Sequence, residues 1–164
     1  DGEPDDLGDA VSLRAWLGAR GLIRETRALD AVDEALPAFH DLRALVHAMT
    51  KRLVDGRSPS TTQVRRLNGV LRDGLHYHQL RPDDDGSRFT VGQVGDELAQ
   101  ARAAIAGSLA HSIADHDVAR LRICANDECS WRFIDRSPTR RRRWCDMRTC
   151  GNRAKVRAHA QRHR

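Results

Sequence analysis

Four cysteines near the end of the chain constrain its fold more than any other feature. They are the only cysteines among the 164 residues and follow the pattern C-x4-C-x15-C-x4-C, at Cys124, Cys129, Cys145 and Cys150. Two close pairs joined by one segment allow four thiolates to surround one tetrahedral Zn²⁺ ion. The sequence therefore predicts one structural zinc site, with the residues between the two pairs folding back as a hairpin.

Two other interpretations of the cysteines are open. Two disulfides would need an oxidising compartment, and no secretory leader is visible; an iron–sulfur cluster would use the same sulfurs. We favour zinc, because no oxidising compartment is implied and a chance gathering of four free thiols within 27 residues is improbable. A nodule of roughly forty residues with few large apolar side chains cannot offset its chain entropy unaided. Metal binding, on the order of 10–16 kcal/mol for peptide-scale sites, would supply the missing free energy. Four sulfur ligands leave no position for water, so we expect the metal to be structural.

The residues around these cysteines resemble the CGNR zinc-finger family. Trp144 and Cys145 precede the tetrapeptide Cys150–Arg153, and the first pair forms a Cys-Ala-Asn-x-x-Cys knuckle followed by aromatic residues. Proteins with this finger commonly carry it behind a mostly helical domain called ABATE, described as a stress-induced transcriptional regulator. The resemblance implies nucleic-acid binding and gene regulation.

Charge is divided unevenly along the chain. The whole sequence has a net charge of +5, but residues 119–164 hold 14 Lys/Arg and 4 Asp/Glu, a net of +10, and residues 1–118 have a net of −5. Four thiolates with one Zn²⁺ would leave the tail at about +8. This asymmetry marks the tail as the part that meets a polyanion. No run of 18 apolar residues occurs, so we expect no membrane span and a cytoplasmic protein.

Periodic apolar residues predict that residues 1–118 form a mainly helical domain. We expect a short helix capped by Ser12 and stopped by Gly21, a helix over residues 26–36, one from Pro37 to about Val54, one from Thr61 or Thr62 to Gly74, and one from about Val94 to Ile113. Residues 75–80 and 87–91 flank the turn PDDDG and predict a β-hairpin. The run 12–23 resembles the early helix of ABATE domains. Those domains usually begin with a strand that is not found here, so we expect an ABATE-like domain without its first strand.

Residues 119–164 are expected to form a small treble-clef-like zinc finger with four cysteine ligands, which makes the fold class mainly α with some β (α+β). Trp131–Ile134 would be a strand, and Ser137 and Pro138 would start a turn of helix that presents the arginines. The terminal helix would run from about Cys150 to His163. On it, Asn152, Val156 and His163 are predicted to pack on the nodule, while Arg153, Arg157 and Arg164 share one face.

Basic residues of the tail are predicted to contact nucleic acid, because guanidinium groups can bind phosphates bidentately. The candidates are Arg140, Arg141, Arg142, Arg143, Arg148, Asn152, Arg153, Lys155, Arg157 and Arg162. Asn152 and Arg153 could contact base edges in a major groove. A structural role suits Arg153 equally well, because it lies beside a predicted ligand. The alternative for the whole set is a solvated, solubilising tail.

We therefore expect a zinc-dependent, DNA-binding transcriptional regulator whose helical domain senses a ligand or forms a homodimer. The alternative is a zinc-stabilised module that binds RNA or an acidic protein partner. The sequence has no Ser-His-Asp setting, phosphate-binding glycine loop or carboxylate pair beside an open metal site, so we expect no enzyme. His76 and His78 lie on one predicted strand face, where they could contact an effector; we favour a solvated face.

Overall fold

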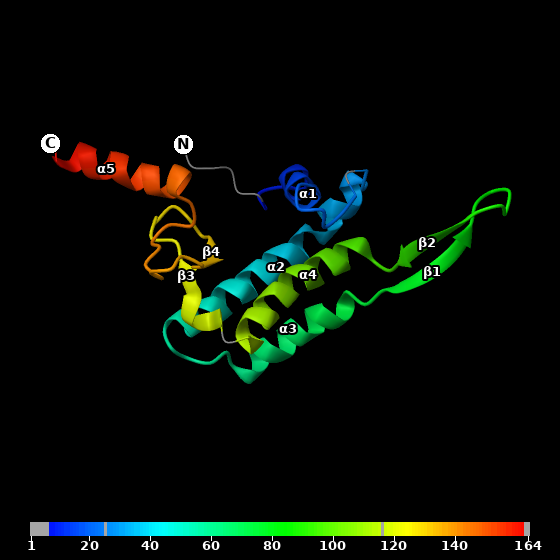
Figure 1. Cartoon of the computed structure of the whole chain (residues 1–164), viewed down its shortest axis with the longest axis horizontal. Helices are drawn as coiled ribbons and strands as arrows, with labels where there is room; N and C mark the ends of the chain where they lie inside the picture. Colours follow the sequence, from blue (N-terminus) through cyan, green and yellow to red (C-terminus); the bar gives the residue numbers. More distant parts are fainter. Residues whose placement is uncertain (1–6, 25, 116, 163–164) are drawn as a thin grey trace. The chain divides into compact units, whose positions relative to one another are not determined.

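The computed structural model describes residues 7–24, 26–115 and 117–162, which fall into two compact units. One unit comprises residues 7–45 and 61–110, and the other comprises residues 46–60 and the described residues from 111 onward. The elements, in order, are α1 (Ala10–Gly18), α2 (Leu29–Val54), α3 (Thr61–Asp73), β1 (Tyr77–Pro82), β2 (Phe89–Val94), α4 (Glu97–Ala114), η1 (Asp117–Arg120), β3 (Leu121–Ile123), β4 (Arg132–Ile134), η2 (Met147–Gly151) and α5 (Asn152–Arg162) (Figure 1). The predicted class, mainly α with a β-hairpin and a four-cysteine nodule, is confirmed.

Aliphatic and aromatic side chains from three helices form the core of the first unit. Leu13 and Leu17 of α1 pack with Val32 and Phe39 of α2 and with Leu98 of α4. The two α2 residues are seven positions apart, which places them on the same helix face two turns from each other. Both side chains therefore face the same core.

α2 is one continuous helix that contains Pro37, so the prediction of one helix over residues 26–36 and another starting at Pro37 is wrong. A proline inside a helix costs about 3 kcal/mol or more. Val32 and Phe39, on either side of it, are only 0% and 2% exposed. Burying two such side chains contributes roughly 3–6 kcal/mol. This burial offsets the free-energy cost of Pro37 only if the helix continues past the proline, because only then do Val32 and Phe39 face the same core.

The start of α1 differs from the prediction, whereas its end agrees. Asp9, not Ser12, is the N-cap residue: its Oδ1 accepts the backbone N–H of Ser12 at 2.7 Å. This hydrogen bond lowers the pKa of Asp9 below its usual value. Ser12 already lies in the first helical turn, so its N–H is one of the donors that a cap must satisfy. The chain turns away at Gly21, which has a φ of 64°.

α3 ends at Asp73, just before the glycine at position 74 that was predicted to end it, and this end lies next to α4. A Cβ atom at Gly74 would lie 2.2 Å from the Cβ of Ala103 on α4. Only glycine lets the chain leave α3 so close to its neighbour. α4 itself begins at Glu97 rather than near Val94, because Val94 belongs to β2, where it is paired with Tyr77.

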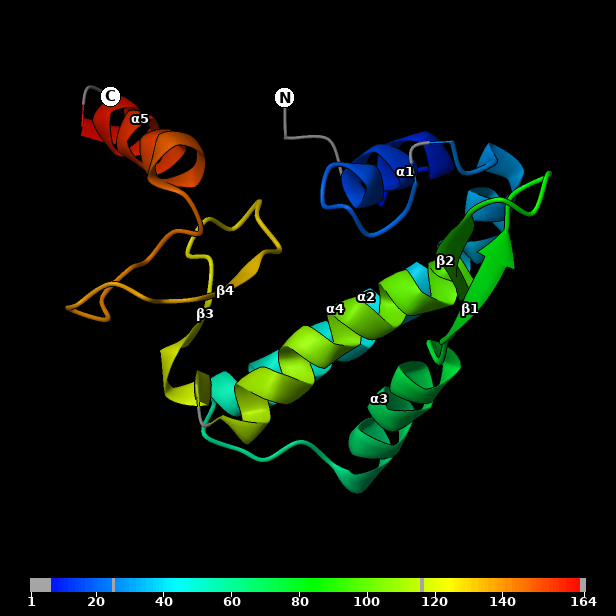
Figure 2. The same cartoon turned by 45° about the vertical axis from the view of Figure 1, so that its right-hand side comes forward.

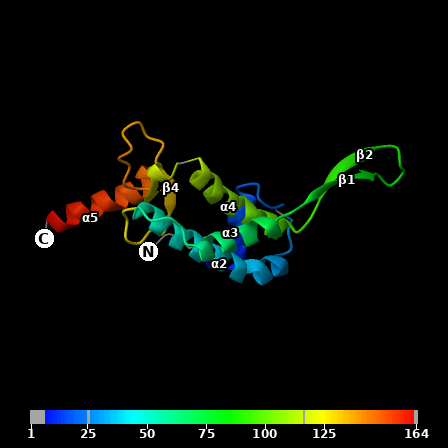
Figure 3. The same ribbon diagram turned by 90° about the horizontal axis from the view of Figure 1, so that it is seen from below.

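The predicted hairpin is present as β1 and β2, an antiparallel pair in which Leu80 lies opposite Val91. It extends beyond the ends of α3 and α4 (Figures 2 and 3). The Leu80 and Val91 side chains are 63% and 69% exposed. His76 and His78 are also exposed, and their rings meet edge to face with centroids 5.9 Å apart. Their exposure agrees with the solvated surface that we favoured, but only His78 lies in β1, and His76 precedes the strand.

Candidate metal centre and basic surface

The four cysteine sulfurs form one cluster in the second unit. All four Sγ atoms lie within 4.8 Å of one another. The Sγ of Cys145 is 3.8 Å from that of Cys129 and 3.6 Å from that of Cys150. A tetrahedral zinc ion with Zn–S bonds of about 2.3 Å would separate its sulfur ligands by about 3.8 Å. All four cysteines are free thiols, so the disulfide interpretation is not supported, and the spacing fits a metal ion.

The electrostatics of the cluster also favour a cation. Burial raises the pKa of the Cys145 and Cys129 thiols, and hydrogen bonds with neighbouring cysteines add to the increase at Cys145. Burial acts in the same direction on Cys124, but hydrogen bonds, above all from the backbone N–H of Cys145 at 3.5 Å, lower its pKa. Four thiolates this close repel one another in the absence of a positive ion. A divalent metal ion would allow all four to lose their protons.

The first cysteine pair lies in the loop of a second hairpin. β3 pairs antiparallel with β4, and Arg122 lies opposite Phe133. The backbone N–H of Cys124 extends this pairing by donating to the Trp131 carbonyl at 3.0 Å. The predicted strand at 131–134 is confirmed, but the prediction that residues between the two cysteine pairs supply both strands is wrong. The partner strand precedes Cys124, because the alternating residues of 121–123 form a better strand than the Arg-rich segment with Pro138.

The second cysteine pair is positioned by a capped helical turn. Asp146 is the N-cap residue of η2, and its Oδ1 accepts the backbone N–H groups of Arg148 at 2.6 Å and Thr149 at 3.1 Å. This cap fixes the turn that carries Cys150, which is 1% exposed. η2 continues directly into α5. The last ligand therefore lies at the start of the basic terminal helix, as predicted.

A buried carboxylate organises the arginine-rich loop. Asp135 is 0% exposed, and its Oδ1 accepts the Ser137 N–H at 2.9 Å and the Ser137 hydroxyl at 2.6 Å. Its Oδ2 accepts the backbone N–H of Arg142 at 2.8 Å. The bonds from Ser137 lower the pKa of Asp135. The predicted helical turn at Ser137 and Pro138 is wrong: these residues form a non-helical turn, because Ser137 binds this carboxylate instead of capping a helix.

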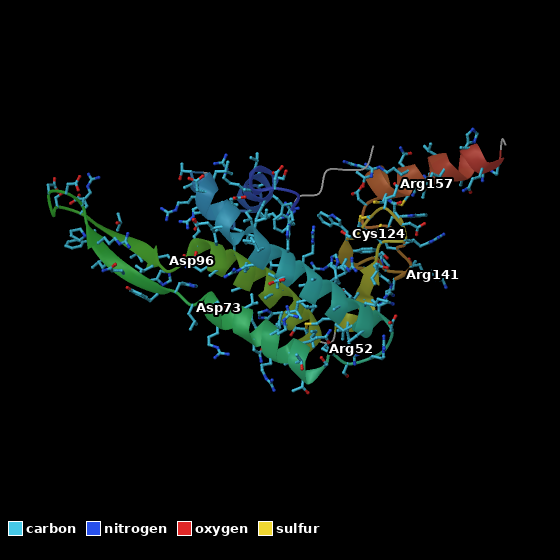
Figure 4. The ribbon with its side chains drawn as sticks, turned by 180° about the vertical axis from the view of Figure 1, so that it is seen from behind. Arg52, Asp73, Asp96, Cys124, Arg141 and Arg157 are labelled. Carbon is cyan, nitrogen blue, oxygen red and sulfur yellow. The ribbon has the colours of Figure 1, made fainter. Side chains whose placement is uncertain are left out.

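The predicted nucleic-acid contacts differ in exposure and in partners. Nine of the ten are exposed, namely Arg140, Arg141, Arg142, Arg143, Arg148, Asn152, Lys155, Arg157 and Arg162, and Arg153 is partly buried. Arg141 points away from the nodule (Figure 4). The Arg143 guanidinium lies over the Trp144 ring, 5.1 Å from its centroid. The structure therefore brings most of these side chains to the surface of the nodule.

Arg142 makes its contacts within the nodule. Its Nε donates to the Trp144 carbonyl at 3.0 Å, and its Nη2 donates to the Cys145 carbonyl. The guanidinium also lies over the Phe133 ring, 5.2 Å from the centroid. These contacts connect the arginine-rich loop to the strand β4 and to a predicted metal ligand. Sequence reasoning did not separate Arg142 from its three neighbours.

Arg157 also makes contacts inside the nodule. Its Nη1 pairs with Oε2 of Glu128 at 2.9 Å, and its Nη2 donates to Oδ1 of Asn126. Val156, which was predicted to pack on the nodule, is 61% exposed, and Asn152 is exposed too. That prediction is wrong for both. Arg157 makes the contact instead, because the first cysteine loop offers polar acceptors that its guanidinium reaches. His163 and Arg164 lie outside the described residues.

Asn126 is a residue that sequence reasoning missed. It is 1% exposed, and its Nδ2 donates to the Sγ of Cys150 at 3.6 Å. Its backbone carbonyl accepts the N–H of Cys129 at 2.8 Å. The available signal was its place inside the Cys-Ala-Asn-x-x-Cys knuckle, which was used only as part of a resemblance.

Together these features define a helical domain followed by a four-cysteine nodule of the zinc-finger class. Comparison with known families finds two matches: residues 120–163 match the CGNR zinc finger, and residues 1–116 match ABATE, described as "Putative stress-induced transcription regulator". The chain belongs to this family of ABATE proteins with a CGNR zinc finger. A comparison with curated proteins found no match. Within the described residues, no helix is both long and apolar enough to cross a membrane.

Proposed function

We propose that the protein is a zinc-dependent, DNA-binding transcriptional regulator. In this proposal one structural Zn²⁺ ion is held by Cys124, Cys129, Cys145 and Cys150, and the nodule that it stabilises binds the duplex. The helical domain senses a ligand or forms a homodimer. The metal has no catalytic task, because four sulfur ligands leave no coordination position for water.

The observation that carries the proposal is the set of exposed cations on a nodule that a metal would hold in shape. Residues 119–164 have a net charge of +10. Arg142 and Arg157 are assigned to holding the nodule together through their hydrogen bonds. We assign phosphate contacts to the other exposed cations of the predicted set: Arg140, Arg141, Arg143, Arg148, Lys155 and Arg162. Arginine and lysine groups of this number provide affinity for a phosphate backbone, and Asn152 is the candidate for contact with base edges.

A gel-shift titration with purified protein of verified zinc content tests the proposal. We expect retardation of duplex DNA at low salt, with an affinity that falls with salt at a logarithmic slope of about 0.9 per phosphate contacted. Absence of retardation at low salt would contradict it. Competition with duplex DNA, RNA and heparin separates the candidates, because equal displacement by all three indicates a general polyanion-binding module.

A further inference from the structure

The terminal helix α5 is held in place without a hydrophobic face. None of its described residues is buried, and the apolar Val156 is 61% exposed. An isolated helix of about this length is marginal in water, because most helices depend on tertiary packing. Its attachment therefore depends on its connection to η2 and on polar contacts.

The contacts of Arg157 lead from this helix to the metal site. The guanidinium binds two residues of the first cysteine loop, Glu128 and the buried Asn126. The amide nitrogen of Asn126 then donates to the sulfur of Cys150. A chain of hydrogen bonds thus runs from α5, through a side chain that is 1% exposed, to a predicted metal ligand.

Only one orientation of the Asn126 amide suits both neighbours. In the observed orientation its oxygen accepts from a guanidinium and its NH₂ group donates to a sulfur. The reverse orientation would place an NH₂ group against the guanidinium and an oxygen against the sulfur, so that donor faces donor at one end and acceptor faces acceptor at the other. A thiolate bound to a metal is a stronger acceptor than a neutral thiol. The Arg157 guanidinium and the Cys150 sulfur together therefore set the direction of the hydrogen-bond chain.

We propose that Asn126 is a positioning residue that couples metal binding at Cys150 to the placement of α5. When the sulfur is a metal-bound thiolate, it fixes the amide, and the amide presents its oxygen to Arg157. Loss of the metal weakens the hydrogen bond from Asn126 to the Cys150 sulfur, and the amide then no longer holds the guanidinium of Arg157. For nucleic-acid binding, a consequence that rests on the proposed function, the basic helix is then in position only in the metal-loaded protein.

The first test measures the metal site in the full chain with Zn²⁺ and Co²⁺ as probes. Asn126→Ala should lower Zn²⁺ affinity by about 10- to 100-fold, the range typical of residues that hydrogen-bond to metal ligands. It should also shift the thiolate-to-Co²⁺ charge-transfer band, because one sulfur loses a hydrogen bond. Arg157→Ala should leave this band in place. An unchanged band and an unchanged affinity in Asn126→Ala would overturn the proposal.

The second test measures the helix, at saturating Zn²⁺, by hydrogen exchange of the α5 amides. Arg157→Ala and Asn126→Ala should both speed amide exchange in α5. The double variant should exchange no faster than the faster single variant, because each of the three variants breaks the same chain of hydrogen bonds. Glu128→Gln is the matched control: it keeps an acceptor oxygen for Arg157 and should change exchange little. Unchanged α5 exchange in Arg157→Ala, which does not touch the cysteines, would overturn the proposal even if Asn126→Ala failed to fold.

Duplex binding distinguishes this inference from the proposed function. If Arg157 positions the helix, Arg157→Ala should also remove the phosphate contacts of Lys155 and Arg162 on α5, so the salt slope should fall by more than 1, whereas loss of a single phosphate contact would reduce that slope by about 1. The latter result would overturn the positioning role. If the unmodified protein binds no duplex at all, the proposed function fails, and the Co²⁺ band and α5 exchange still decide the inference.

Discussion

The backbone N–H of Arg142 donates to Oδ2 of Asp135 at 2.8 Å, across seven positions of the chain. This bond closes the arginine-rich loop on itself. The same carboxylate also accepts hydrogen bonds from the backbone N–H and the hydroxyl group of Ser137. A single buried acid thus determines how the loop displays its arginines. The conformation of the basic surface depends on a negative charge beneath it.

Replacing that acid should loosen the loop. Asp135→Ala removes three acceptor contacts and leaves the Ser137 and Arg142 N–H groups without this partner, so the melting temperature should fall and exchange of the loop amides should accelerate. Asp135→Asn keeps the shape and one acceptor oxygen and should have a smaller effect. Equal behaviour of both variants and the unmodified protein in thermal unfolding and hydrogen exchange would contradict this role.

Removing the metal should unfold the nodule and spare the helical unit. The nodule has few buried apolar residues, whereas the first unit has its own core around Leu13, Leu17 and Phe39. A chelator should therefore abolish amide protection in β3, β4 and α5, while α1 and the first half of α2 stay protected. Hydrogen exchange before and after chelation, with Zn²⁺ added back as the control, checks this. Retained protection in α5 after complete metal removal would contradict it.

Metal affinity should depend steeply on pH. Burial raises the pKa of Cys129 and Cys145 in the metal-free site, so both are thiols at neutral pH and must lose protons when the metal binds. Apparent affinity should therefore fall as the pH is lowered, by about tenfold per pH unit for each proton released. Competition with a chelator of known proton linkage, between about pH 6 and about pH 8, measures the slope. A flat profile would show that the thiols are already ionised.

Adjacent arginines should respond differently to substitution. Arg141 points outward, so Arg141→Ala should weaken duplex binding, reduce the salt slope by about 1 and leave thermal stability unchanged. Arg142 donates to two backbone carbonyls of the nodule, so Arg142→Ala should lower the melting temperature and increase loop exchange. The two variants remove the same charge, so each is the control for the other. If both variants had the same salt slope and the same thermal stability, the assignment of DNA contact to Arg141 and of nodule contacts to Arg142 would be wrong.

The core of the helical unit should be sensitive at Phe39. The side chain is 2% exposed and packs in the cluster shared by α1, α2 and α4. Phe39→Ala should destabilise the unit by about 3–5 kcal/mol, through lost burial and the cavity that remains. Val11 on α1 is 56% exposed, so Val11→Ala is a control that should change stability by less than about 0.5 kcal/mol. Denaturant unfolding at saturating Zn²⁺ measures both.

Sequence periodicity predicted the elements whose shape depends on one apolar face. It placed α3 between Thr61 and Gly74 and the hairpin around the PDDDG turn, because these signals are local. It failed at Pro37, where packing of the flanking Val32 and Phe39 outweighs a local penalty. Spacing alone predicted that the four cysteines meet, because the ligand pattern is itself a geometric constraint.

The polar framework of the nodule was not predictable in the same way. Asp135 and Asn126 look like ordinary loop residues, and their roles depend on partners 7 and 31 positions away along the chain. The different roles of Arg141 and Arg142 have the same origin. The two residues are identical and adjacent in sequence, and only the fold places backbone carbonyls within reach of Arg142. Local sequence identifies a basic loop but not which of its cations the fold already uses.

Every residue of β1 is exposed to solvent. A two-stranded ribbon that covers so little side-chain area is marginal by itself. Separating its strands costs few contacts beyond the interstrand hydrogen bonds, so it can occur while the helices remain intact. The hairpin should behave as an independent local equilibrium, with an opening free energy far below that of the core helices α1, α2 and α4, and an added protease should cut the hairpin before it cuts those helices.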